Sequence, residues 1–236
     1  MAIFKFKQFT IRQDKTTMKV GTDGVLLGAW VKINQDVNSI LDIGAGTGII
    51  ALQMAQRSNA ERIDAIEIAP QAYEQAVENF ESSKWSDRLF CYHGSLQTFT
   101  VEIEEQYDLI VSNPPFFKRD NQIKDKGRAK ARQNTTLSYA DLLRCSAKLL
   151  SEKGRCAFII PFLEEQKFLD LALENNLYPQ RISHVKGHKT AAIKRSLLQL
   201  SFTKSNPIID ELVIEISRHN YTDAYKNLVK DFYLRM

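Results

Sequence analysis

Residues 41–48 read LDIGAGTG and complete a short apolar run that begins at residue 39. Glycines at positions 44, 46 and 48 let the chain turn sharply and let a ligand approach the backbone closely. A helical pattern, IIALQMAQ, follows at once. Strand, glycine turn and helix in this order are typical of a doubly wound α/β fold, in which ligands bind at the carboxyl ends of the strands. The last glycine of the dinucleotide pattern is missing, so the turn favours a smaller adenosine ligand. The alternative is a structural tight turn that binds nothing.

Further apolar runs alternate with helical patterns along the chain. The runs are at residues 62–68, 89–94, 107–113 and 154–161, and the helical patterns are at residues 70–82, 138–151 and 164–175. Runs without strict alternation of polar and apolar residues indicate strands that are covered on both faces. Strand and helix in alternation predict right-handed crossovers and a mostly parallel sheet.

The last third of the chain has a different pattern. Residues 178–186, 195–203 and 211–217 resemble strands, with no clear helix between the last two, which predicts an antiparallel edge to the sheet. Residues 222–234 form an amphipathic pattern that begins at a capping residue, Thr222. Because no linker or repeat interrupts the pattern, we expect one domain over residues 1–236, with an N-terminal extension at 1–38.

Composition excludes several classes of protein. No apolar run reaches the roughly 18 residues that a membrane-spanning helix needs. The first fifteen residues contain Lys5 and Lys7 and no apolar core, so they do not resemble a signal peptide, and we expect a cytoplasmic protein. The three cysteines are far apart and lack a C-x-x-C spacing, and among the four histidines only His184 and His188 lie four residues apart, so we expect no metal site and no disulfides. These residues are Cys91, Cys145, Cys156, His93, His184, His188 and His219.

Glu67 lies near the end of the second apolar run, 23 residues after Gly44. An acidic side chain at this position can accept two hydrogen bonds from the hydroxyls of a ribose. Its neighbours Ala65, Ile66 and Ile68 are apolar. The sequence therefore predicts a ribose contact at Glu67; an exposed carboxylate at a strand end is the alternative.

The most specific element is VSNPPF at residues 111–116, which ends the fourth apolar run. Two prolines after a strand remove backbone donors and stiffen the turn. The side-chain oxygen of Asn113 and the carbonyl of Pro114 can then accept both hydrogens of a planar amino group, which directs its lone pair toward an electrophilic methyl group. Phe116 offers a flat face on which a base can stack. The alternative is a stiff loop beside an aromatic core residue.

A basic segment follows this turn, in a loop at residues 117–133. The chain as a whole has a net charge of +4, yet residues 118–132 contain seven basic residues and only two acidic ones. Such a segment favours contact with phosphates, although a solvated loop would have the same composition. The basic residues are Lys118, Arg119, Lys124, Lys126, Arg128, Lys130 and Arg132.

The motifs LDIGAGTG, IEI and NPPF, in this order, resemble those of the Rossmann-like S-adenosylmethionine methyltransferases that act on amino groups. The stretches FKFKQFTIRQDKTTMKVGTDGVLLGAW and NYTDAYKNLVKDFYL extend the likeness over residues 4–234. Over this range the chain resembles the bacterial tRNA1(Val) adenine N6-methyltransferase family, which modifies the adenine just 3′ of the anticodon. The resemblance implies a class I methyltransferase fold: a mostly parallel seven-stranded sheet with an antiparallel C-terminal edge and helices on both faces. It also implies S-adenosylmethionine as the cofactor and tRNA as the partner.

The same resemblance implies which residues hold the two ligands. Those expected to contact the cofactor are Lys19, Thr22, Asp23, Asp42, Gly44, Ala45, Gly46, Glu67, Ile68, Ser95 and Asn113. Those expected to hold the methyl acceptor are Asn113, Pro114, Pro115 and Phe116. Members of the family usually carry an acidic residue after the third strand that binds the adenine of the cofactor. This chain has Ser95 there, which can form a hydrogen bond but carries no charge.

Adenine N6 is one of several amino groups that such a turn can hold. The N2 of guanine in RNA and the N5 of a protein glutamine are also planar, although the basic segment weighs against a protein substrate. A DNA methyltransferase would need a recognition domain for which 236 residues leave little room. A non-catalytic RNA-binding protein would need neither Asn113 nor the glycine turn. We therefore predict methyl transfer to N6 of a flipped-out adenine in tRNA, at position 37 by resemblance.

Overall fold

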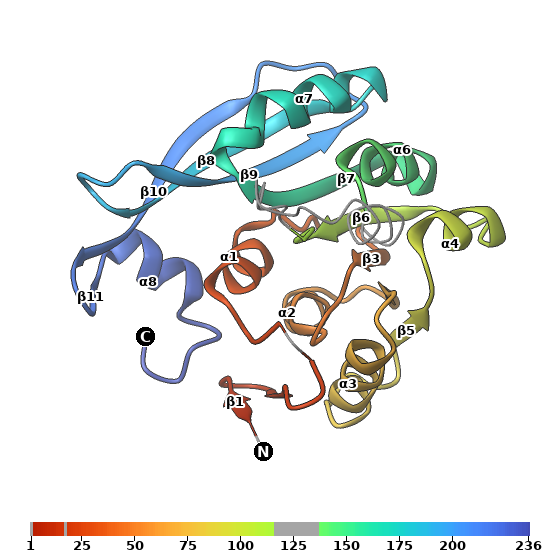
Figure 1. The fold of residues 1–236 in the computed structure, drawn as a ribbon, viewed down its shortest axis with the longest axis horizontal. Helices are drawn as coiled ribbons and strands as arrows, with labels where there is room; N and C mark the ends of the chain where they lie inside the picture. Colours follow the sequence, from red (N-terminus) through yellow and green to blue (C-terminus); the bar gives the residue numbers. More distant parts are fainter. Residues whose placement is uncertain (1, 17, 116–136) are drawn as a thin grey trace, which may run out of the picture.

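The computed structural model describes residues 2–16, 18–115 and 137–236 (Figure 1). The strands are β1 (Ile3–Lys5), β2 (Thr10–Arg12), β3 (Ser39–Ile43), β4 (Arg62–Glu67), β5 (Leu89–His93), β6 (Tyr107–Ser112), β7 (Leu150–Pro161), β8 (Tyr178–His188), β9 (Ile193–Ser201), β10 (Ile208–Ser217) and β11 (Asn220–Tyr221). The helices are α1 (Thr22–Trp30), α2 (Ile49–Arg57), α3 (Pro70–Glu81), α4 (Leu96–Glu102), α6 (Tyr139–Leu149), the 3-10 helix η1 (Phe162–Glu164), α7 (Glu165–Glu174) and α8 (Asp223–Val229).

Nine of the described strands form one sheet in the order β11-β10-β8-β9-β7-β6-β3-β4-β5, and β1 pairs with β2 in a separate antiparallel pair. The neighbours β5, β4, β3, β6 and β7 are all parallel. Alternating strands and helices therefore produce the expected α/β class I architecture. The sheet has nine strands rather than the seven expected, because β10 and β11 extend it beyond β8.

The C-terminal edge differs in detail from the expected antiparallel one. β9 returns from β8 through a hairpin and lies between β7 and β8, antiparallel to both. β10 then pairs in parallel with the outer side of β8, and β11 folds back antiparallel onto β10. Because β9 is antiparallel to both neighbours, β7 and β8 run in the same direction. Their carboxyl ends therefore lie at the same edge of the sheet.

Two apolar clusters cover the two faces of the sheet. Figure 1 shows α6 and α7 on one side and α1, α2 and α8 on the other. One cluster contains Leu27 of α1 and Leu52 of α2, and the other contains Leu142 of α6 and Phe168 of α7. This burial on both faces explains why the strand sequences are almost continuously apolar.

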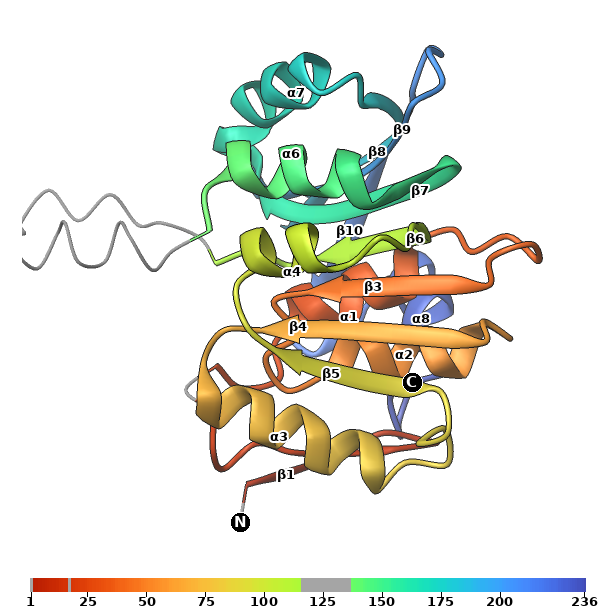
Figure 2. The same ribbon diagram turned by 90° about the vertical axis from the view of Figure 1, so that its right-hand side faces the viewer.

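The parallel strands end together at one edge of the sheet. Ile43 is in register with Ile66 on one side and with Ser112 on the other. Figure 2 shows the arrowheads of β3, β4 and β5 at the same side of the molecule. The glycine turn, Glu67 and Asn113 each follow or end one of the adjacent strands β3, β4 and β6, so this edge brings them together.

The end of the chain packs against its beginning. The helix expected over residues 222–234 ends at Val229, because the chain then leaves the helix to pair with the N-terminal segment. Phe6 forms an isolated antiparallel bridge with Tyr233, and the N–H of Lys7 donates to the carbonyl of Phe232 at 2.8 Å. The expected cap is present, since the Thr222 hydroxyl accepts from the N–H of Tyr225 at 3.1 Å.

Candidate active site

The glycine turn after β3 has an unusual backbone. Gly44, Gly46 and Gly48 have φ angles of 75°, 57° and 78°, in the left-handed region that glycine adopts without strain. A Cβ at Gly48 would lie 2.5 Å from Cε1 of Phe80, whereas a Cβ at Gly44 or Gly46 would meet nothing within 4 Å. The third glycine is therefore required for packing against α3. The first two border open space into which a ligand can fit.

Glu67 holds this turn in place. Its side chain is 8% exposed, and its two carboxylate oxygens accept from the N–H of Gly46 and the N–H of Ala69, both at 2.8 Å. Each carboxylate oxygen can accept a second hydrogen bond, so the side chain can still bind the hydroxyls of a ribose. Sequence reasoning predicted the ribose contact but missed this support of the turn.

Asp42 lies beneath the turn and is fully buried. One of its oxygens accepts from the N–H of Ala51 in α2 at 3.1 Å, and its other oxygen, Oδ1, has no hydrogen-bond partner among the described residues. Loss of solvation raises the pKa of Asp42 to about 7; the Ala51 N–H opposes this rise, and the nearby carboxylate of Glu67 adds to it. Asp42 thus ties the strand to the following helix.

Asn113 follows β6 and is half-buried. Its side-chain oxygen, Oδ1, is shielded from solvent and has no hydrogen-bond partner within the described ranges. A buried acceptor without a donor costs free energy, so it needs a partner such as water or a ligand. Pro114 is buried and Pro115 is exposed. The Ser112 hydroxyl donates to the carbonyl of Ile43 at 2.7 Å, which fixes Asn113 beside the glycine turn.

The segment from Lys19 to Asp23 leads into α1 on the same side of the sheet as α2. The Lys19 ammonium donates to the carbonyl of Gln13 at 3.2 Å, and the Gln13 side-chain oxygen accepts from the N–H of Val20 at 2.7 Å. Thr22 is the first helical residue. Asp23 accepts from Nε of Arg195 in β9 at 2.9 Å. Contacts within the chain therefore hold this segment at the start of α1.

Ile68 and Ser95 differ in how freely they could meet a cofactor. Ile68 directly follows Glu67 and is 52% exposed. A residue that contacts the adenine or ribose of a cofactor must be exposed in this way. The Ser95 hydroxyl instead caps α4, where it accepts from the N–H of Thr98 at 3.1 Å and lies 2.8 Å from the Thr98 hydroxyl. This cap role was not predicted from the sequence.

Some predicted site residues lie outside the described residues. They are Phe116 and the basic residues Lys118, Arg119, Lys124, Lys126, Arg128, Lys130 and Arg132. In the part of the chain that the structure does describe, no group of three acidic, histidine or cysteine side chains could hold a metal ion. In that part there is also no helix with the length and apolarity to span a bilayer.

Comparison with known proteins decides the family. A family sequence model described as "Methyltransferase small domain" matches residues 24–161. Proteins from Christiangramia forsetii and Flavobacterium johnsoniae, each named tRNA1(Val) (adenine(37)-N6)-methyltransferase, are 54% and 56% identical to this chain over 235 residues. The alignments cover 99% of this chain and 98% and 100% of the two relatives. The chain belongs to this methyltransferase family.

A solved structure supports the fold of this methyltransferase independently. A predicted O-methyltransferase from Agrobacterium tumefaciens superposes with a TM-score of 0.70, covering 89% of this chain and 96% of that protein. At 17% sequence identity, this likeness shows the fold alone. The predictions of a class I fold and of an S-adenosylmethionine-dependent methyltransferase are confirmed.

Proposed function

We propose that this methyltransferase transfers a methyl group from S-adenosylmethionine to N6 of adenine 37 in tRNA1(Val). The names of its relatives support the substrate. The buried, unpaired Oδ1 of Asn113 is the structural observation that carries the chemistry. The proposal treats residues 1–236 as one methyltransferase domain that acts where tRNA is processed, in the cytoplasm.

The residues at the carboxyl edge fit an adenosine-containing cofactor. The space beside Gly44 and Gly46 is open, so the cofactor can approach the backbone there. Glu67 can still accept hydrogen bonds from the ribose. The exposed Ile68 can cover one face of the adenine. When bound here, S-adenosylmethionine supplies an activated methyl group, so the chain needs to provide alignment rather than a nucleophile or a metal.

Asn113 and Pro114 would orient the acceptor. The Oδ1 of Asn113 accepts one hydrogen of the adenine amino group, and the carbonyl of Pro114 accepts the other. Both hydrogens are then held in the plane of the base, and the lone pair of N6 points out of that plane. The orphaned Oδ1 gains the partner that it lacks within the described residues. Holding both hydrogens selects an amino group over a carbonyl oxygen at the same ring position.

The target adenine must leave its stack to reach this corner, because Asn113 lies at the end of a strand within a half-buried site. An unpaired loop makes this extrusion cheap, and RNA recognition commonly uses loops with unstacked bases. This geometry favours a nucleotide in a tRNA loop over one in a duplex.

The proposal can be tested by product identification. The protein is incubated with methyl-labelled cofactor and, separately, with total tRNA, total rRNA and total protein, and each product is digested and analysed. We expect label in tRNA as N6-methyladenosine at position 37. Label as N2-methylguanosine in rRNA or as methylated glutamine in protein would contradict the proposal, and cofactor binding without transfer to any pool would favour an RNA-binding protein.

A further inference from the structure

A basic hairpin continues the carboxyl edge of the sheet beyond the candidate active site. It is formed by the end of β8 and the start of β9, and the N–H of Ala191 donates to the carbonyl of His188 at 2.9 Å in its turn. Because β8 runs in the same direction as β7, the tip of this hairpin lies at the edge of the sheet where Asn113 follows β6. Residues 184–195 contain four lysines and arginines and no acidic residue.

The cations of this hairpin fall into two groups. Lys186 lies 2.6 Å from Glu211, and Arg195 lies 2.9 Å from Asp23, so both are paired with carboxylates. Lys189 and Lys194 are exposed, and neither has an acidic partner in the described ranges. Exposed His188 lies beside Lys189, and exposed Arg218 and His219 follow the end of the adjacent strand β10. The hairpin therefore presents uncompensated positive charge.

An aromatic groove of about 890 Å³ opens at the base of this hairpin. Gly187 of β8 lines one side, and Gly21 and Thr22, at the start of α1, line another. Phe4, Tyr221, Tyr225 and Tyr233 are among its lining residues. Tyr221 and Tyr225 lie with ring centroids 5.3 Å apart, and Phe4 and Tyr233 lie 6.2 Å apart. The groove thus lies between the hairpin and the start of α1, where Thr22 is one of the predicted cofactor contacts.

The groove sets cations beside aromatic rings. Lys5 and Arg235 line it, together with the acidic side chain of Glu215 and the last residue, Met236. Phe4, Tyr221 and Tyr233 are partly exposed and line the groove. Partly exposed aromatic rings beside cations are the combination with which proteins bind unpaired nucleotides, since the rings stack on bases and the cations contact phosphates.

We propose that the β8–β9 hairpin and this groove form a second RNA-contact surface. Lys189 and Lys194 bind phosphates of the tRNA, and the groove receives an unpaired nucleotide near the target adenine. This inference rests on the proposed function, because it takes a tRNA loop as the substrate. It adds a contact surface that is separate from the basic segment at residues 118–132.

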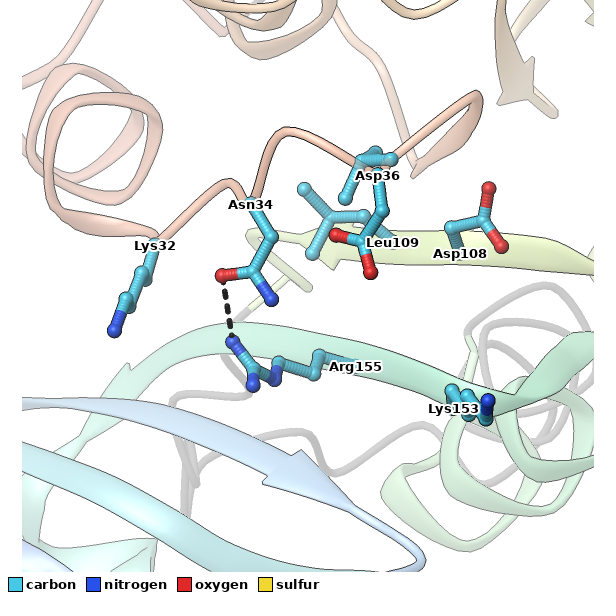
Figure 3. A pocket seen from close by; sticks show the side chains of 8 residues that line it. Lys32, Asn34, Asp36, Asp108, Leu109, Lys153 and Arg155 are labelled. Atoms are coloured by element: carbon cyan, nitrogen blue, oxygen red, sulfur yellow. Dashed lines mark hydrogen bonds between the residues drawn. The ribbon is translucent and has the colours of Figure 1, made fainter.

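The hairpin is tested by measuring the affinity for tRNA1(Val) transcript over a range of salt concentrations. In the variant Lys189→Ala/Lys194→Ala, the loss of two phosphate contacts should lower the affinity about tenfold at 0.1 M salt and reduce the salt slope by about one to two. The control Lys32→Ala/Lys153→Ala removes two cations at the opposite edge of the sheet, where Figure 3 shows both side chains, and should bind as the wild type does. An unchanged slope in the hairpin variant overturns this contact.

The groove is tested with Tyr221, which lies on the short edge strand β11. Tyr221→Leu removes a ring that can stack and should weaken tRNA binding about tenfold, whereas Tyr221→Phe keeps the ring and should bind normally. Tyr178→Leu is a matched control, because Tyr178 lies at the amino end of β8. Equal affinity of Tyr221→Leu and the wild type overturns the groove contact. Thermal unfolding of each variant checks that the fold is intact.

Failure of this inference can be told apart from failure of the proposed function. The wild-type product decides the proposed function, independently of either surface. If the wild type methylates adenine 37 and the hairpin and groove variants bind tRNA as the wild type does, only the second contact surface is wrong. If the wild type does not methylate tRNA, the proposed function is wrong. Cofactor affinity, measured by calorimetry, should be unchanged in every variant.

Discussion

Glu67 supports the glycine turn and can bind a ribose, and both roles depend on its two acceptor oxygens. Its two oxygens accept from the N–H groups of Gly46 and Ala69, and it retains capacity for a ribose. Gln at this position has one acceptor oxygen and a donor amide, so it cannot satisfy both N–H groups. We expect Glu67→Gln to weaken cofactor binding by at least about tenfold in calorimetry.

Glu61→Gln is the matched control for this experiment. Glu61 is exposed and precedes β4, at the end of the strand opposite to Glu67. Its substitution should leave the cofactor dissociation constant unchanged. The same dissociation constant for Glu67→Gln and Glu61→Gln would remove Glu67 from the cofactor site.

Asp42 should make stability depend on pH. Its pKa is raised to about 7 in the folded protein, against about 3.9 in an unfolded chain. The folded state therefore binds the proton more tightly, and this contribution to stability is full below about pH 4 and is lost as the pH rises to about 7. In Asp42→Asn this loss is absent, and on the order of 2–4 kcal/mol of pH dependence should disappear.

Urea unfolding of the wild type and Asp42→Asn at several pH values from 4 to 8 measures this effect. The free energy of unfolding of the variant relative to the wild type should rise across this range. A difference that stays constant with pH would show that Asp42 does not titrate between these values.

At the residue scale, short-range signals in the sequence identified most of the candidate site. The glycine turn, Glu67 and Asn113 stand at strand ends, and strand ends in a parallel sheet share an edge. Contacts between residues far apart in sequence were not predictable. The pairing of Arg195 with Asp23 and the contact of Gly48 with Phe80 depend on which strands and helices become neighbours.

At the element scale, the cap of α6 is a local feature with a measurable contribution. The Ser138 hydroxyl accepts from the N–H of Asp141 at 3.0 Å. Ser138→Ala should lower the free energy of unfolding by about 1 kcal/mol, because an N–H in the first turn loses its acceptor. Ser138→Asp keeps an acceptor and should retain most of the stability. Equal stability of Ser138→Ala and the wild type in urea unfolding would show that the cap contributes nothing.

Elements with local signals were predicted, and those fixed by distant packing were not. The helices α3, α6 and α7 have apolar stripes in the sequence, and α6 begins at the expected capping residue. Helix α1 was not predicted, because seven of its nine residues are buried and it therefore lacks a polar face. The position of β9 between β7 and β8 also could not be predicted from the local sequence, because it depends on pairing with both neighbours.

At the scale of the whole molecule, the net charge of +4 conceals an uneven distribution. The segment at residues 118–132 contains seven basic and two acidic residues, a net charge of +5, so the rest of the chain has a net charge of −1. Replacing Lys124, Lys126, Arg128 and Lys130 with Ala should lower tRNA affinity and reduce its salt slope by about three, if each contacts a phosphate of an unpaired strand. A slope equal to that of the wild type would mean that this segment does not contact tRNA.

The central claim is that the side-chain oxygen of Asn113 holds the amino group that becomes methylated. Because this oxygen has no partner within the described residues, Asn113→Ala should fold normally, and it should keep most of its cofactor affinity through the other cofactor contacts. Asn34→Ala is the matched control, since the Asn34 amide oxygen accepts from Arg155 at 3.1 Å at the opposite edge of the sheet (Figure 3).

The most direct measurement is the single-turnover rate of methyl transfer to tRNA1(Val) by these two variants at saturating cofactor. We predict a rate about 100-fold or more below that of the wild type for Asn113→Ala and a wild-type rate for Asn34→Ala. A rate for Asn113→Ala within about threefold of the wild type would contradict the account. It would show that the side-chain oxygen of Asn113 does not orient the amino group during transfer.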